Sequence, residues 1–493
     1  MLRGEKKILN IKIHKIKSKY NNIPLPLKVS FWYFFCSLLQ KGISFITLPI
    51  FTRVLSTEEY GVISIYNSWE QIIIIFLTLN LSNSVFNVGL VRFDNDRDNF
   101  QSSMVGLEII ITLIMSLILF LVYNSLIPII QLDYRYIFIM TVQCFFTIIL
   151  GMWTLRQRFD YNYKKMTIVS VLNIILGVLV SLVLVFMLKD KSFGKISGTA
   201  IILMIIGLFC FFDMVKGKKS IVNFKYWKFA LLYNIPMIPH FISSVILNQL
   251  DRIMIQNMIG LSEAGIYSVA YSSACVVYIL NQALAASYNP WLLQRLKKKM
   301  YSGIKQVVNA ILLLYLSLLI LIILFAPEIM KIMATVDYYD GIYVIPPVAG
   351  SMFFILLFTM FGPIEHYSLK TKFIGIASTV SALVNVLLNY IFINAFGYLA
   401  AGYTTLACYV IYAFAHWIYM KKCCKDDNML LFDDRKILIM SVVVVSVSIV
   451  SALFYSYSTL RYLFILSIIL LCVSRRKKIT AILADLTKKN NVQ

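Results

Sequence analysis

The chain has 493 residues, of which 60% are hydrophobic and 14% are charged, whereas soluble domains carry about 45–50% apolar and about 25% charged residues. A single core cannot hide this excess, because cores stop growing near about 300 residues, so the composition excludes a water-soluble protein. The net charge of +23 would indicate a nucleic-acid partner in a soluble chain, but the basic residues lie where a membrane protein needs them.

A helix needs about 20 apolar residues to cross the hydrocarbon layer of a membrane. Fourteen such stretches follow one another along the chain, and they predict an all-α polytopic membrane protein without a sizeable extramembrane domain. The predicted helices are 29–49, 61–88, 103–126, 136–155, 166–188, 196–214, 229–250, 264–287, 306–326, 341–363, 373–395, 398–420, 437–455 and 459–474.

The basic residues predict the orientation of these helices. If the amino terminus is cytoplasmic, the external connections carry eight Lys and Arg, Lys41 lies inside the first helix, and the other 37 of the 46 are cytoplasmic. This asymmetry is a strong positive-inside signal, so we expect both termini in the cytoplasm. The eight external residues are Arg53, Arg135, Lys189, Lys191, Lys195, Arg252, Lys331 and Arg461.

A weak internal repeat indicates two lobes. A shift of 204 residues superposes the start of the second helix and the connection before it on the same region of the eighth helix. Six helices separate the copies, so both cross the membrane in the same direction, which is typical of two-lobed alternating-access transporters. The superposed pairs are Glu59 on Glu263, Gly61 on Gly265, Ser64 on Ser268 and Ser68 on Ser272.

We therefore expect two six-helix lobes related by pseudo-two-fold symmetry, plus two extra carboxyl-terminal helices. The arm that precedes the first helix is basic and has no apolar core, so it is not a cleavable signal peptide. The predicted division is a basic cytoplasmic arm (1–28), an amino-terminal lobe (29–214), a basic cytoplasmic linker (215–228), a carboxyl-terminal lobe (229–420), two additional transmembrane helices (421–474) and a basic cytoplasmic tail (475–493).

The sequence lacks the motifs of an enzyme or an ATP-driven motor. No glycine-rich phosphate loop precedes a Lys-Ser or Lys-Thr pair, so the energy for transport must come from a gradient, with H⁺ or Na⁺ as the candidate coupling ion. We expect neither a cofactor nor a metal site, because the four histidines are scattered along the chain. A glycan polymerase or ligase is the enzymatic alternative, but the external connections are too short for its catalytic loops.

Three stretches in order carry a family resemblance. The first runs from Leu48-Pro49 through Thr52-Arg53 to Glu59-Tyr60-Gly61, the second joins Asp251-Arg252 to Gly265-Ile266-Tyr267-Ser268, and the third joins Asn385 and Asn389 to Ala400-Ala401-Gly402. Together they resemble the polysaccharide-transporter branch of the multidrug/oligosaccharidyl-lipid/polysaccharide (MOP) flippase superfamily, the Wzx-type O-antigen and capsule flippases. In this family motif, Arg53, Glu59, Gly61 and Gly265 belong to the external loops.

The resemblance implies a bilobed fold around a central cavity, and a substrate that is a lipid (undecaprenyl)-pyrophosphate-linked oligosaccharide. Such a protein would move the repeat unit from the cytoplasmic to the outer leaflet of the bacterial plasma (inner) membrane by alternating access. For surface polysaccharide export it would work in the lipid bilayer with a glycan polymerase and an export machinery. The related multidrug branch supplies the alternative of a drug or cation extruder.

Lys41 is the candidate contact for the pyrophosphate. It lies 13 residues after Lys28 and 12 before Arg53, roughly 18 Å from either flank of the first helix and too deep to reach the interface easily. A lysine at this depth costs about 2.5–3.5 kcal/mol, so we expect it to face water or a counter-charge. Glu70 in the second helix and Glu108 in the third are each either an ion site or a structural partner of Lys41.

The seventh helix carries the other candidates. His240 lies near its middle, and Pro236 and Pro239 beside it each remove a backbone hydrogen bond, which predicts a kinked helix on a cavity wall. A histidine bonded to a neighbouring carbonyl is an equal interpretation. The polar end of this helix is predicted to contact sugar hydroxyls, with an interfacial ion pair as the alternative, and comprises Asn248, Gln249, Asp251 and Arg252.

Overall fold

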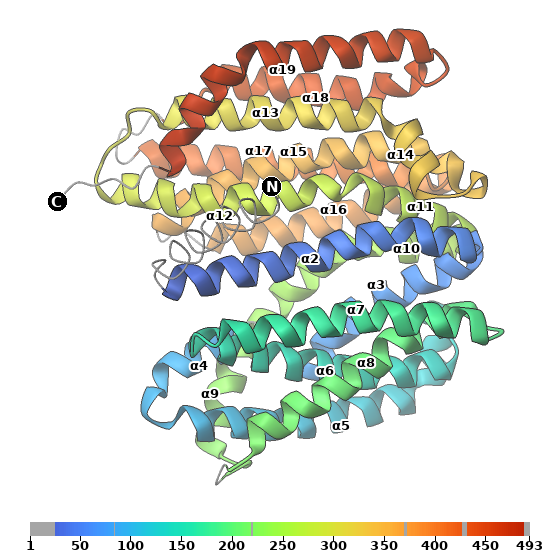
Figure 1. Cartoon of the computed structure of the whole chain (residues 1–493), viewed down its shortest axis with the longest axis vertical. Helices are drawn as coiled ribbons and strands as arrows, with labels where there is room; N and C mark the ends of the chain where they lie inside the picture. Colours follow the sequence, from blue (N-terminus) through green and yellow to red (C-terminus); the bar gives the residue numbers. More distant parts are fainter. Residues whose placement is uncertain (1–24, 83, 218–219, 369–371, 426–430, 488–493) are drawn as a thin grey trace, which may run out of the picture.

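The computed structural model describes residues 25–82, 84–217, 220–368, 372–425 and 431–487. The predicted basic arm up to residue 24 and the side chains of the predicted tail lie outside this description. All regular structure in the described ranges is helical (Figure 1). The amino-terminal half contains α2 (Leu25–Val54), α3 (Thr57–Thr78), α4 (Val85–Arg92), η1 (Asp94–Asp96), α5 (Arg97–Ile130), α6 (Tyr134–Phe159), α7 (Tyr163–Met187), α8 (Lys191–Val215) and α9 (Phe224–Asn234).

The remainder of the chain continues the same antiparallel pattern of long helices. It contains η2 (Ile235–Met237), α10 (Ile238–Met258), α11 (Leu261–Ala274), α12 (Val276–Lys297), α13 (Ile304–Leu324), α14 (Ala326–Met333), η3 (Val336–Tyr343), α15 (Ile345–Tyr367), α16 (Lys372–Phe396), α17 (Ala400–Lys425), α18 (Asp434–Val450), η4 (Ser451–Phe454) and α19 (Ser458–Thr487).

Helices of membrane-spanning length dominate the described chain. Within it, 11 helices are long and apolar enough to cross a bilayer, or 12 if the bent pair α11–α12 is one span. The less apolar α17 and the shorter apolar part of α19, Ser458–Ser474, account for the difference from the predicted fourteen. Many large apolar side chains on these helices are exposed, as lipid-facing surfaces require. The prediction of an all-α polytopic membrane protein is confirmed, and the chain is a multi-pass membrane protein.

Several predicted helix boundaries are wrong, and the predicted eighth helix is not straight. The second span ends at Thr78 rather than at residue 88, because Leu79 and Asn80 adopt left-handed conformations with φ of 46° and 53°, and the hydroxyl of Thr78 accepts a hydrogen bond from the Asn80 amide. The eighth span bends by 41° between α11 and α12. The seventh span continues to Met258 instead of ending near residue 250, which carries Asp251 and Arg252 into the protein interior.

Two hydrophobic cores sort the helices into a first group, α2–α9, and a second group, α10–α19. One core lies within the first group, and its fully buried members include Phe86, Phe100 and Trp153. The other core fills the second group and also reaches into the first, because it includes Phe51 and Ile63. The two groups therefore share a core along part of their length, and over the remaining length each group packs on its own.

The shared region is the end of the bundle where α2 meets α3, which we call the closed end. Here several hydrogen bonds join the two groups across the interface. Their donors and acceptors are Thr52 and the Met333 carbonyl at 2.6 Å, Tyr338 and the Ser56 carbonyl at 2.8 Å, Ser262 and Thr57 at 2.7 Å, and Gln256 and Gln131 at 3.0 Å. The other end, where α6 turns into α7, is called the opposite end.

The internal repeat meets itself at the closed end. A Cβ atom on Gly61 of α3 would overlap the carbonyl oxygen of Leu261, and one on Gly265 of α11 would overlap that of Thr57. Thr57 and Leu261 are themselves 204 residues apart, so the two clashes are reciprocal. The hydroxyl groups of the repeat partners Ser64 and Ser268 are in hydrogen-bonding contact. The two copies thus face each other across the pseudo-two-fold axis, and glycine allows their backbones to approach this closely.

The seventh span is divided between the two groups. Its first half, α9, packs on α5 of the first group, where the Trp227 indole donates to the Ser103 carbonyl at 2.8 Å. Its second half, α10, packs on α16 of the second group, where Ser243 bonds to Thr379 at 3.1 Å. Between them lies the 3₁₀ turn Ile235–Met237 at the two prolines. The connection that joins the groups is therefore a break inside a membrane span.

Given the transport function that the resemblance implies, we expect the double substitution Pro236→Ala with Pro239→Ala to lower transport about tenfold, because a continuous helix would tie α9 and α10 into one rigid rod. Transport by cells carrying the variant, normalised to the amount of protein in the membrane, measures this effect. Pro128→Ala provides the matched control, since Pro128 lies inside α5 within a single group. Normal transport by the double variant would show that the break is not a hinge.

Candidate functional site

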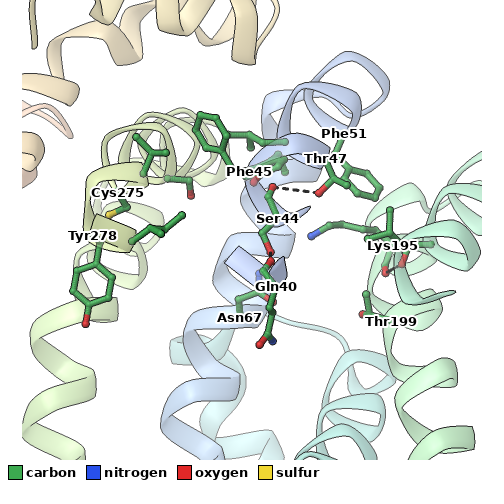
Figure 2. A pocket seen from close by; sticks show the side chains of 17 residues that line it. Gln40, Ser44, Phe45, Thr47, Phe51, Asn67, Lys195, Thr199, Cys275 and Tyr278 are labelled. Atoms are coloured by element: carbon green, nitrogen blue, oxygen red, sulfur yellow. Dashed lines mark hydrogen bonds between the residues drawn. The ribbon is translucent and has the colours of Figure 1, made fainter. Parts of the chain in front are cut away.

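A cavity of about 650 Å³ lies between the two groups, on the inner side of the closed end. Residues of α2, α3, α7 and α8 form its first wall, and residues near the α11–α12 bend form the other. Figure 2 shows Gln40, Ser44 and Asn67 facing the cavity from the first group, with Tyr278 on the far side. Hydroxyl and amide groups supply most of the polar lining.

Lys195 of α8 is the charged residue among the described side chains that line this cavity. Its side chain extends toward α2 (Figure 2), and its ammonium nitrogen lies 5.4 Å from the centre of the Phe51 ring and 6.0 Å from that of Tyr60. It is half-buried and forms no ion pair with a carboxylate of the described residues. An unpaired cation in a partly desolvated cavity attracts an anionic ligand group.

Two further cavities continue from this one toward the opposite end. The second, of about 510 Å³, shares Gln40 with the first. The third, of about 790 Å³, shares Asn87, Leu155 and Arg158 with the second and reaches the α6–α7 turn, where Tyr161 is exposed. Together the three form a track along the first group that is blocked at the closed end and reaches the surface at the opposite end.

Sequence reasoning missed Lys195, Arg97 and Arg158 as lining residues. Lys195 was assigned to an external connection because the sixth helix was predicted to begin at residue 196, whereas α8 begins at Lys191. The spacing of Lys191 and Lys195, four residues apart on one helix face, was the available signal. Arg97 and Arg158 were counted with the cytoplasmic basic residues, and nothing in the sequence separates them from their neighbours.

The family motif of the external loops forms the closed end. Arg53 donates to the carbonyl of Pro49 at 2.6 Å within α2 and to that of Ile332 at 3.1 Å across the interface. Glu59 completes a capping box with Ser56, which starts α3 immediately after a two-residue connection. With Gly61 and Gly265 at the crossing of α3 and α11, the motif residues hold the two groups together and leave the cavity lining to other residues.

Two of the three predicted intramembrane charges, Glu70 and Glu108, lie apart from the described cavity linings. Lys41 is in the middle of α2, but its side chain lies outside the description, so its role as a pyrophosphate contact stays a prediction. Glu70 of α3 accepts a hydrogen bond from Gln143 of α6 at 2.9 Å. Glu108 of α5 is fully buried and accepts from Thr112 at 3.0 Å. Both carboxyl groups belong to the interior of the first group.

The polar residues of the seventh span bond mainly to the protein. Gln249 accepts from Ser68 of α3 at 3.3 Å and from Arg252 at 3.4 Å, and the buried Arg252 guanidinium lies 4.3 Å from the Tyr271 ring centre. Asn248 accepts from a tyrosine of α17 at 3.0 Å. His240 is exposed on the first turn of α10. None of these four side chains lines the three described cavities.

Asp251 is the centre of a buried polar cluster in the second group. Its carboxylate, 1% exposed, accepts hydrogen bonds from Tyr267 at 2.9 Å, Asn389 at 2.8 Å and Thr405 at 2.8 Å. These donors come from α11, α16 and α17, so the cluster joins four helices. Asn385 accepts from Asn389 at 3.2 Å. These hydrogen bonds satisfy the buried carboxylate and tie the four helices together.

Asp251→Ala should strongly destabilise the protein, because it leaves three buried donors without an acceptor at about 1–3 kcal/mol each. The thermal midpoint of the purified, detergent-solubilised protein measures the loss. Asp94→Ala is the control, since Asp94 is exposed at the opposite end. Equal midpoints for the two variants would contradict a structural role for the cluster.

Solved structures define the class to which this architecture belongs. The lipid II flippase MurJ in an inward closed conformation matches with a TM-score of 0.63 at 14% identity, over 92% of this chain and 100% of that one. An inward-facing multidrug resistance MATE family transporter of the MOP superfamily matches with a TM-score of 0.62 at 13% identity, over 80% and 96% of the two chains. This protein therefore shares the fold of these two transporters, which confirms the predicted fold class.

The sequence assigns the family within that class. Residues 27–292, more than half of the chain, match the model of the family described as polysaccharide biosynthesis protein, and the chain belongs to this family. Protein 1 of the Lsg locus of Haemophilus influenzae is 23% identical over 283 residues, which cover 55% of this chain and 67% of that protein. The resemblance inferred from the three sequence motifs is confirmed.

Proposed function

We propose that the protein is a flippase that moves a lipid-pyrophosphate-linked oligosaccharide from the cytoplasmic to the outer leaflet by alternating access, and that it is not an enzyme. The observation that supports this most directly is the cavity track, which is blocked at one end, reaches the surface at the other and carries the unpaired Lys195. The hydroxyls and amides along the track suit a glycan, and the lysine suits the pyrophosphate. The lipid tail would stay in the bilayer beside the protein.

The charges of the lining favour this substrate over the cationic substrates of a multidrug extruder. Lys195, Arg97 and Arg158 line the three cavities, whereas the carboxylate among the described lining residues, Asp160, pairs with Arg156 at 2.5 Å. A cationic drug would have to enter against this positive field, while an anionic head group would be attracted by it. The drug extruder therefore remains the second candidate.

The proposal includes an orientation and an energy source. The positive-inside asymmetry of the sequence supports cytoplasmic termini in a bacterial inner membrane, which places the closed end outside and the opposite end in the cytoplasm. We propose coupling to H⁺ or Na⁺. A glycan polymerase and an export machinery would then act on the translocated unit.

A conditional deletion strain tests the function through an inventory of its lipid-linked glycans. A flippase mutant accumulates repeat units that face the cytoplasm and loses the surface polysaccharide. Unchanged surface glycan with new drug sensitivity would instead support the extruder. Elongation of lipid-linked glycans by the purified protein would support a polymerase and would overturn the proposal.

A further inference from the structure

Two arginines without a carboxylate partner line the cavity at the opposite end. Arg97, at the start of α5, donates to the Leu90 carbonyl at 3.1 Å and stacks 4.6 Å from the centre of the Phe159 ring. Arg158, in the last turn of α6, stacks 4.5 Å from the centre of the Tyr33 ring. Among the described residues neither guanidinium forms an ion pair. Ring stacking orients both groups and leaves most of their N–H donors available.

The neighbouring Arg156 shows the contrasting arrangement. It pairs with Asp98 at 3.2 Å and with Asp160 at 2.5 Å, so these two carboxylates are already engaged by a third arginine. The field in the third cavity is therefore positive although Asp160 contributes to its lining. Two fork-shaped donors in a cavity of about 790 Å³ are suited to a phosphate ester or a diphosphate, which guanidinium groups bind through paired N–H donors.

The position of Arg158 connects this pair to the rest of the track. Arg158 lines both the second and the third cavity, whereas Lys195 lies in the first cavity near the start of α8. Both α6 and α8 run from the closed end to the opposite end, and about 20 residues of helix separate the levels of the two cations. This corresponds to roughly 30 Å, which is close to the thickness of the hydrocarbon layer.

From this placement we propose that Arg97 and Arg158 form a loading site for the phosphate groups of a lipid at the cytoplasmic mouth, separate from Lys195. The inference rests on the proposed function in one respect, that the phosphates loaded are those of the transported lipid. The arginine pair would then lie at the level of the cytoplasmic leaflet's head groups, and Lys195 at the level of the outer leaflet's head groups. The diphosphate would bind first at the arginine pair and later reach Lys195 along the second cavity, whose described lining carries no charged side chain other than Arg158.

Binding of diphosphates to the full-length protein in phosphatidylcholine nanodiscs tests the site. Farnesyl pyrophosphate and inorganic pyrophosphate are the probes, and isothermal titration gives the affinities. We expect Arg97→Gln and Arg158→Gln each to weaken binding about tenfold and the double variant at least about 100-fold. Arg97→Lys with Arg158→Lys should bind with intermediate affinity, because charge is kept and the fork geometry is lost. Lys164→Gln, an exposed cation at the same end, should bind like the unmodified protein.

Nanodiscs that contain phosphatidylglycerol distinguish the two sources of phosphate. If the pair loads the substrate, pyrophosphate affinity changes less than twofold when this lipid is added. Strong competition by phosphatidylglycerol would identify a phospholipid site and overturn the proposal. Unchanged pyrophosphate affinity in a folded double variant would also overturn it. A deletion strain with a normal glycan inventory, combined with lost pyrophosphate binding in the double variant, would refute the flippase and leave a diphosphate site in place.

Discussion

Lys195→Ala is expected to reduce export of the lipid-linked glycan by at least about 100-fold while the protein still inserts and folds. A pyrophosphate in the inter-group cavity has left bulk water, and an unpaired buried anion is strongly unfavourable. Removing the partner of a buried charge costs about 3–5 kcal/mol, and about 1.4 kcal/mol corresponds to a tenfold change. The half-buried Lys195 ammonium faces neutral polar groups across the cavity (Figure 2), and no other lining residue whose side chain the structure describes carries a positive charge there.

Complementation of the deletion strain measures this effect, with the amount of protein in the membrane determined in parallel. Lys195→Arg should retain part of the activity because the charge remains. Lys189→Ala is the matched control, since Lys189 is an exposed lysine in the connection just before α8. Export by Lys195→Ala at more than half of the unmodified level would exclude Lys195 as the anion contact.

The sequence was sufficient to predict the membrane-spanning architecture. Apolar runs of about 20 residues have one stable arrangement in lipid, because every backbone polar group must be bonded within the segment. The membrane-spanning helices, the family motif and the repeat can therefore be recognised from local sequence patterns. The interruption at Leu79 and Asn80 cannot, since a bulky residue such as Leu79 rarely adopts the left-handed backbone conformation that it has here.

The site depended on packing that sequence patterns do not encode. Asp251 and Arg252 were placed at a helix end because polar residues favour interfaces, yet α10 continues for six residues beyond them and three neighbouring helices satisfy the carboxylate. Lys195 was placed outside the membrane by an error of a few residues at a helix start. A boundary error of that size moves a side chain from solvent to a cavity wall.

The repeat was visible in the sequence, but contact between its copies was not. The shift of 204 residues relates Ser64 to Ser268 in the sequence, but it carries no information on whether the two side chains are in contact. In the structure their hydroxyl groups are bonded to each other, which requires the pseudo-two-fold axis to pass between α3 and α11. The crossing at Gly61 and Gly265 is then the place where the closed end would have to separate in order to open.

A disulfide across this crossing should therefore stop transport. We expect oxidation of the double variant Ser64→Cys with Ser268→Cys to lower export at least about tenfold, and reduction to restore it. The side chains already meet, so a disulfide, which needs Cβ atoms about 3.5–4.5 Å apart, can form with little backbone movement. Cross-linked protein would keep the track facing the opposite end, because α3 and α11 could no longer move apart.

Transport into the outer leaflet of reconstituted vesicles, measured before and after oxidation, provides the test. Each single cysteine variant is a control for the eight native cysteines, which are free in the structure, and neither should respond to the oxidant. Mass spectrometry must show that the cross-link has formed. If the cross-linked protein transports as fast as the reduced protein, the two groups do not separate at α3 and α11, and alternating access through this crossing is wrong.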